Sequence, residues 1–347
     1  MLEKIEKKNF KSISGVGKTE QQELADRMYA NNKHVFNQEK VALKIDYTKE
    51  IRTFQTSEAF LHELETKINE PSVSRQIDDT TLRFYDLSPA YLDFKEHGNW
   101  QQVFQQFKIT VKYAELARKI TRRFFTTSFF KTLNEGDQEN FVSDLYGFIT
   151  IYFSIQQEAK ESGFKAVDVD MQSFLSCDEL VILRKISDVE DFLVKGPGTD
   201  VYGIQVRIAL PLLADFINTT DEFIATKAVN AQLRFTHAEA IAPYAALMGI
   251  VGTAKPAKQL NDIDKLWPAE KIIPLSANIQ WILYKKKDAE TYLVKFLLNE
   301  KEVAITGLPA TAFPFYKWED VRRFYMNKIS GLLSPGSGYL DYLRKVK

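Results

Sequence analysis

The sequence of 347 residues contains a single cysteine, Cys177. An internal disulfide is therefore excluded, and we expect Cys177 to be a buried structural residue rather than a catalyst. No run of 18 apolar residues occurs, which argues against a membrane partner. The start, MLEKIEKKNFKSISG, has no apolar stretch after its lysines and does not read as a signal peptide. As written, the chain is expected to stay in the cytoplasm.

An excess of charge of either sign is also missing. Lys and Arg total 46 and Asp and Glu total 46, so no global field attracts nucleic acid or a membrane surface. Any preference for anions must come from local clusters. Apolar residues make up 45% of the chain and charged residues 27%, which is typical of a globular protein rather than a disordered one.

The hydrophobic patterns predict an α/β unit interrupted by a helical insert. Between 91 and 194 periodic apolar residues continue without a convincing strand, and the turn Lys195-Gly196-Pro197-Gly198 ends this region. We therefore expect residues 1–90 and 195–347 to form one α/β domain and residues 91–194 an all-helical cap. Strands are predicted at 41–45, 81–85, 231–235, 279–284, 292–298 and 303–305, and helices at 19–31, 202–217, 238–248 and 318–329. A further helix is predicted after the first strand, with Phe54, Phe60 and Leu64 among its core-facing residues.

The segment LRFTHAE, residues 233–239, is the strongest candidate for chemistry. A strand delivers His237 at its carboxyl end, and Glu239 falls in the first turn of the next helix, where the helix dipole favours anions. A histidine there can bind a phosphoryl oxygen, and a glutamate can protonate a departing alkoxide. The alternative is a capping arrangement in which Glu239 only stabilises its helix.

Further cations could bind the same anion. Arg52 follows a strand and opens a helix, and its planar guanidinium suits phosphate, although in isolation such a residue is more often a surface arginine on an amphipathic helix. Lys195 precedes a glycine turn that could approach a ligand or could simply end a helix. Residues 107–131 hold seven cations against one acid, and Lys119 and Arg122 are the candidates among them. A solvated helix surface remains the alternative for these two.

These segments, in this order, resemble the histidine acid phosphatases, and most closely the multiple inositol polyphosphate phosphatases. The His-Ala-Glu run in LRFTHAEAIAPYAALM carries the resemblance, and IRTFQTSEAFL, LRFYDLSPAY and the KGPG turn extend it over most of the chain. The resemblance implies a three-layer, phosphoglycerate-mutase-like domain with a helical cap. It further implies His237 and Arg52 as phosphate ligands, Glu239 as proton donor, an inositol polyphosphate substrate such as phytate, and no metal or organic cofactor.

One part of the family pattern is missing from the sequence. The family opens with R-H-G-x-R, whose histidine becomes phosphorylated, and no such segment occurs here. We therefore expect an N-terminally truncated form of a phytase-like enzyme, whose full-length protein would be periplasmic or secreted. A non-catalytic binder of phosphorylated ligands and an interaction module on the same scaffold are the alternatives.

Overall fold

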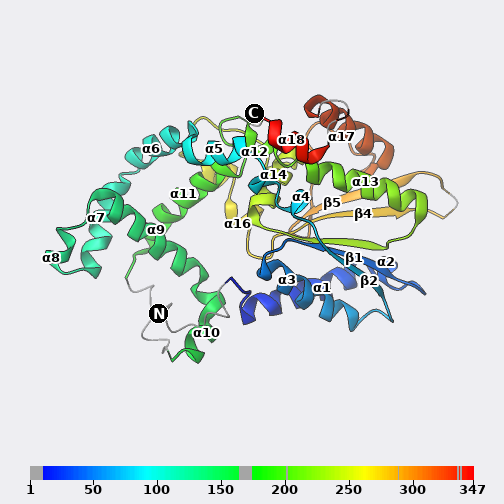
Figure 1. The fold of residues 1–347 in the computed structure, drawn as a ribbon, viewed down its shortest axis with the longest axis horizontal. Coiled ribbons are helices and arrows are strands. Elements are labelled where there is room, and N and C mark those ends of the chain that lie inside the picture. Colours follow the sequence, from blue (N-terminus) through cyan, green and yellow to red (C-terminus); the bar gives the residue numbers. More distant parts are fainter. Residues whose placement is uncertain (1–10, 164–173, 201, 288, 334–335, 337) are drawn as a thin grey trace.

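The computed structural model describes residues 11–163, 174–200, 202–287, 289–333, 336 and 338–347. Figure 1 shows a body of strands and helices from which an arch of helices extends. The strands of the body lie between two layers of helices, as in the three-layer α/β arrangement expected from the sequence. This architecture places the carboxyl ends of its parallel strands beside the arch.

The first sheet is parallel and has the order β2-β1-β3. Its strands are β1 (Ala42–Tyr47), β2 (Ser72–Ile77) and β3 (Ala231–Phe235). Helices α1 (Gly15–Asn31) and α3 (Ile51–Glu65) cover one face, where Leu43 and Ile45 are 1% and 0% exposed. The alternation of apolar and polar residues along β1 explains this burial, because every second side chain faces the same helices.

The second sheet is antiparallel and contains β4 (Ile279–Lys285), β5 (Tyr292–Leu298), β6 (Lys301–Glu302) and β7 (Phe315–Lys317). Helices α13 (Leu210–Thr226), α14 (Ala238–Met248) and α17 (Trp318–Leu332) share its hydrophobic core. Trp281 of β4 stacks on Tyr325 of α17 with ring centroids 5.7 Å apart. Aromatic residues therefore fix the second sheet against the layer that contains α13, α14 and α17.

The described residues between 91 and 194 are helical and contain no strand. Their buried residues, including Phe107, Ile120, Val142 and Val189, share one hydrophobic core with residues outside the segment, among them Ala242, Ile263 and Trp267. The helices are α5 (Pro89–His97), α6 (Trp100–Thr110), α7 (Tyr113–Phe124), α8 (Thr127–Phe130), α9 (Glu135–Tyr152), η4 (Phe153–Ile155), α10 (Gln156–Glu161) and α11 (Cys177–Val194).

Short helices complete the described fold, and several of them lie where the sequence analysis placed other structure. They are α2 (Lys33–Phe36), α4 (Asp79–Leu82), η3 (Phe84–Asp86), α12 (Ile204–Arg207), α15 (Ile263–Leu266), α16 (Ala269–Ile272) and α18 (Tyr339–Lys345). The strand predicted at 81–85 is wrong, since α4 and η3 occupy it. The helix predicted at 202–217 is divided between α12 and α13.

Three smaller expectations also need correction. Helix α1 begins at Gly15 because Ser14 caps it, accepting a hydrogen bond from the Gly17 amide at 3.1 Å. The run at 303–305 forms only an isolated bridge, between Ile250 and Ile305. Cys177 is exposed rather than buried, since it occupies the first position of α11, next to the Ser176 cap.

Candidate functional site

Parallel pairing of β1 with β3 brings two distant segments to one edge of the sheet. Tyr47 pairs with Phe235, so the residues that follow each strand leave the sheet side by side. Thr48 Oγ1 lies 3.1 Å from His237 Nε2, and both side chains are buried. The carboxyl end of a parallel sheet is where α/β proteins bind ligands. The pairing thus fixes His237 at the position expected for a site.

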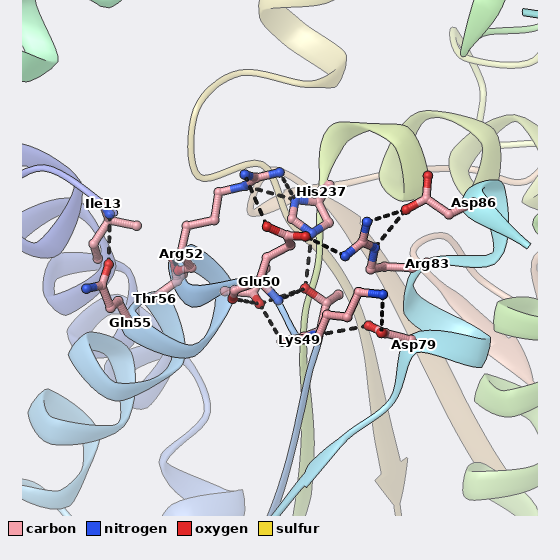
Figure 2. Close-up of polar contacts among 12 residues, drawn as sticks. Ile13, Lys49, Glu50, Arg52, Gln55, Thr56, Asp79, Arg83, Asp86 and His237 are labelled. Atoms are coloured by element: carbon pink, nitrogen blue, oxygen red, sulfur yellow. Dashed lines mark hydrogen bonds and ion pairs between the residues drawn. The ribbon is translucent and has the colours of Figure 1, made fainter. Parts of the chain in front are cut away.

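Arg52 reaches His237 from the first turn of α3, as Figure 2 shows. Its Nε and Nη2 atoms lie 3.3 and 3.2 Å from His237 Nδ1. A guanidinium can only donate hydrogen bonds, so Nδ1 is the acceptor. The ring proton is then on Nε2, which donates to Thr48. Two contacts therefore fix both the orientation and the tautomer of His237.

The same surroundings keep His237 neutral. Burial lowers the pKa of His237 below its usual value, and the positive charge of Arg52 lowers it further. Tyr85 stands edge-on to the imidazole at 90°, with 6.2 Å between the ring centroids. The ring is therefore held on three sides by Thr48, Arg52 and Tyr85.

Glu50 connects Arg52 to a second arginine. Glu50 Oε2 lies 3.9 Å from Arg52 Nη1, and Oε1 lies 2.6 Å from Arg83 Nη1. Arg83 also donates from Nε to Asp86 at 2.9 Å (Figure 2). The hydrogen bond from Arg83 lowers the pKa of Glu50. Arg83 is thus neutralised by two carboxylates, whereas the Arg52 side chain remains 44% exposed and able to meet an anion.

Lys195 and Glu239 form the other side of the candidate site. Lys195 Nζ lies 3.5 Å from Glu239 Oε1 and 2.9 Å from Asp191 Oδ1. The chain turns sharply after Lys195, and Gly198 has φ +57°, a conformation that favours glycine. Burial alone would raise the pKa of Glu239, but Lys195, its own backbone N–H and His237 lower it overall. Glu239 is therefore a carboxylate at neutral pH.

The other two predicted cations do not join this group. Lys119 Nζ pairs with Glu179 Oε1 at 3.0 Å, and Arg122 lies over the Phe130 ring at 5.0 Å. Both residues belong to α7, in the arch and away from β1 and α14 (Figure 1). Their contacts are with neighbours in the helical insert. The structure thus brings Arg52, Lys195, His237 and Glu239 to one region and leaves Lys119 and Arg122 out.

Sequence reasoning missed four residues that shape the site: Thr48, Glu50, Arg83 and Tyr85. Thr48 and Glu50 could have been found, because they lie in the strand-to-helix turn that also holds Arg52. Arg83 and Tyr85 were hidden by the incorrect strand prediction, since their side-chain directions follow from α4 and η3. Among the described residues, no group of three or more His, Cys, Asp and Glu could hold a metal ion. No described helix has the length and apolar character needed to cross a membrane.

Among known proteins, multiple inositol polyphosphate phosphatases are similar to this chain in sequence. No family model matches the chain. Multiple inositol polyphosphate phosphatase 1 of Gallus gallus is 29% identical over 153 residues, covering 41% of this chain and 34% of the relative. The Homo sapiens protein of that name is 26% identical over 161 residues, covering 43% and 32%. Each match spans about a third of the relative's length.

The solved structures extend the likeness to nearly the whole fold. The Bifidobacterium longum multiple inositol polyphosphate phosphatase, in complex with inositol hexasulfate, superposes with a TM-score of 0.77. That alignment has 21% identity and covers 89% of this chain and 78% of the other. The chain has the fold of the multiple inositol polyphosphate phosphatases.

A phytase from D. castellii shares this fold more distantly, with a TM-score of 0.64 and 14% identity over 94% of this chain and 65% of the phytase. The resemblance to multiple inositol polyphosphate phosphatases and phytases that the His-Ala-Glu segment suggested is thereby confirmed. The three-layer fold class is confirmed by the same superpositions.

Proposed function

We propose that this chain supplies the phosphate-binding and proton-donating side of a site that hydrolyses inositol polyphosphates. The contact between Arg52 and His237 supports this most strongly, because it joins residues 185 positions apart at the carboxyl edge of the parallel sheet. The B. longum phosphatase of the same fold binds inositol hexasulfate, a highly charged analogue of the ligand proposed here.

Arg52 would bind the phosphate directly. Its guanidinium now donates to His237 Nδ1, and an arriving phosphate would accept these bonds instead, with a stronger charge-assisted geometry. His237 would then lie against an anion rather than a cation, which favours a second proton on the ring. His237 would thus become a donor to the phosphoryl oxygens only when the ligand is present.

Glu239 would act as the proton donor, and Lys195 would control it. In the free protein Lys195 lowers the pKa of Glu239, so no proton is available. A polyanion that engages Lys195 would weaken this ion pair and raise the pKa of Glu239. The protonated carboxyl could then transfer its proton to the alkoxide oxygen as the phosphorus–oxygen bond breaks.

The nucleophile is not supplied by any R-H-G-x-R segment of the printed sequence. We propose that hydrolysis belongs to a full-length form that carries such a segment. The chain described here should then bind inositol polyphosphates without turning them over. A permanent role as a non-catalytic binder of phosphorylated ligands is the second candidate, which the missing segment favours.

We also propose that residues 91–194 serve as a cap over this site. The two ends of the segment meet, since the Tyr91 hydroxyl donates to the Val194 carbonyl at 3.2 Å. Lys195 follows immediately and contacts Glu239. Such an insert, closed at its base beside the site, could restrict access to large anions.

Calorimetric titration with phytate tests the proposal. Phytate should bind more tightly than inorganic phosphate, and Arg52→Ala should weaken binding about tenfold or more, because a hydrogen bond to a charged group contributes roughly 1.5–3 kcal/mol. Arg322→Ala is the matched control, since Arg322 is 50% exposed and pairs with Asp221. Equal losses in both variants would contradict the assignment. Turnover of phytate that disappears in His237→Ala would contradict the absence of catalysis.

A further inference from the structure

Glu50 stands at the start of α3, but its side chain does not cap the helix. It is the N-cap residue, a position from which side chains usually accept hydrogen bonds from the first amides of a helix. The Glu50 side chain makes no such bond. Its backbone is nevertheless held in place, because its carbonyl accepts from the Thr53 amide at 3.0 Å. The Glu50 carboxylate is therefore free to make other contacts from a fixed position.

Those contacts are with two arginines. Glu50 Oε1 lies 2.6 Å from Arg83 Nη1, and Glu50 Oε2 lies 3.9 Å from Arg52 Nη1 (Figure 2). The side chains of Glu50 and Arg83 are only 21% and 15% exposed. The hydrogen bond from Arg83 lowers the pKa of Glu50, so this side chain is negatively charged at neutral pH. A fixed negative charge is thus part of the candidate site.

With Glu50 in place, all three nitrogens of Arg52 face partners within the protein. Nε and Nη2 lie against His237 Nδ1, and Nη1 faces Glu50. The His237 contact is easily replaced, because a phosphate is a stronger acceptor for a guanidinium than a neutral imidazole is. The Glu50 contact is different, because Glu50 is itself an anion. A phosphate at Arg52 must therefore displace Glu50 or bind beside it.

Displacement of Glu50 is opposed by Arg83. The contact of Glu50 with Arg83 is the shorter of its two arginine contacts. Arg83 is in turn held by Asp86, which accepts from Arg83 Nε at 2.9 Å. A bound phosphate would therefore share Arg52 with a second, anchored negative charge. Like charges this close repel each other, and more strongly near a protein surface than in bulk water.

We propose that Glu50 is a specificity-determining residue, an internal counter-ion that competes with phosphate for Arg52 and keeps the affinity for each single phosphate group low. A ligand with several phosphates offsets this low affinity through contacts elsewhere, such as one with Lys195, whereas inorganic phosphate has no second group. Inorganic phosphate, the product of the proposed hydrolysis, then leaves readily. This inference rests on the proposed function, because it requires that Arg52 binds phosphate.

Replacing Glu50 by glutamine tests the inference with little change in shape. Glu50→Gln keeps an acceptor oxygen for Arg83 but removes the negative charge. Asp86→Asn is the matched control, because it neutralises the other carboxylate that pairs with Arg83. Calorimetric titrations with inorganic phosphate and with phytate are made on both variants and on the original chain. Melting temperatures show that each variant is folded.

Glu50→Gln should bind inorganic phosphate and phytate about threefold or more tightly than the original chain does, because one nearby like charge is gone. Asp86→Asn should change both affinities by less than about twofold. Unchanged or weaker binding in Glu50→Gln, or equal tightening in Asp86→Asn, would overturn the inference. Absence of binding in all three proteins would overturn the proposed function as well, so the two failures can be told apart.

The pKa of His237 in the ligand-free protein provides a second readout, which a merely structural role of Glu50 would not move. Burial and the charge of Arg52 lower this pKa, and the charge of Glu50 partly opposes them. The pKa of His237, followed by its ¹⁵N shifts, should therefore fall further in Glu50→Gln and stay unchanged in Asp86→Asn. An unchanged pKa in Glu50→Gln would contradict the action of Glu50 on the Arg52–His237 pair.

Discussion

Strands β1 and β3 run side by side in the same direction, but their surroundings differ. β1 has partners on both edges, and its apolar residues Leu43 and Ile45 are almost completely buried. Within the described residues β3 has one partner, and each of its five residues is partly exposed. The strand that presents His237 is thus the less supported of the two.

This difference shows that the site and its support are built by separate interactions. The β1–β3 ladder aligns Thr48 with His237, so the polar cluster forms although no described strand pairs with the other edge of β3. The stability of β3 should therefore determine how firmly His237 is held in position.

Truncation of paired core residues should separate the two strands most clearly. Ile45→Ala should lower the free energy of unfolding by about 3 kcal/mol, within the usual range for a buried isoleucine. Leu233 pairs with Ile45 in the β1–β3 ladder, but its side chain lines a cavity. Leu233→Ala should therefore lower the free energy of unfolding by only about 1 kcal/mol or less. Urea denaturation measures both. Equal losses would mean that the cavity closes in solution.

Replacing Thr48 should disturb the site with a smaller loss of stability. Thr48→Val keeps the shape but leaves the buried Nε2 proton of His237 without an acceptor, which costs roughly 1–3 kcal/mol. The ¹⁵N shift of His237 Nε2 should then change, because its proton has lost the acceptor, whereas Nδ1 still accepts from Arg52. Thr48→Ser should restore the original shift. A purely structural role would predict loss of stability in both variants with an unchanged Nε2 shift.

Acid should destabilise the protein through His237. Its pKa is lowered in the folded state, so the unfolded chain takes up a proton first, near the ordinary value of 6.5. The stabilising contribution is present above this value and is lost as pH falls through the lowered folded pKa. In His237→Gln, the free energy of unfolding should fall less as the pH decreases from 6.5 through the folded pKa of His237. In Arg52→Met the pKa of His237 should rise but remain below 6.5, because burial persists.

The smallest effect is expected for the two cations of α7. Lys119→Ala and Arg122→Ala should leave phytate affinity unchanged within about twofold, because their partners are Glu179 and Phe130. Calorimetric titration of both variants beside Arg52→Ala measures this. A loss of affinity comparable to that of Arg52→Ala would show that α7 contributes to phytate binding.

The elements that the sequence predicted best carry strong periodic signals. The strand 231–235, the helix 238–248 and the strand 292–298 have the predicted bounds, because their apolar patterns and flanking turns are unambiguous. β2 was missed because SVSRQI is polar, as exposed edge strands are. Leu82 and Phe84 alternate with polar residues as in a strand, yet both are buried against the core in short helical turns. Tertiary packing decides such segments.

The candidate site, like the fold, was only partly predictable from the sequence. The positions of His237, Glu239 and Arg52 after strands indicated a common edge, and that reasoning used only the parallel topology. The Lys195–Glu239 contact depends on where a helical segment of about a hundred residues returns, which local patterns do not specify. The pairing of Lys119 with Glu179 depends on packing between α7 and α11. The number of cations along the sequence could not show whether they pair within the helical segment or form a binding surface.

Titration of the histidine ¹⁵N signals with phytate tests the central claim most directly. The sequence has four histidines, so the His237 signal can be assigned by comparison with His237→Gln. The account predicts that phytate shifts His237 selectively and raises its pKa, because the anion replaces Arg52 as its neighbour. Unchanged His237 signals at saturating phytate, or equal shifts at His34, His62 and His97, would contradict the account.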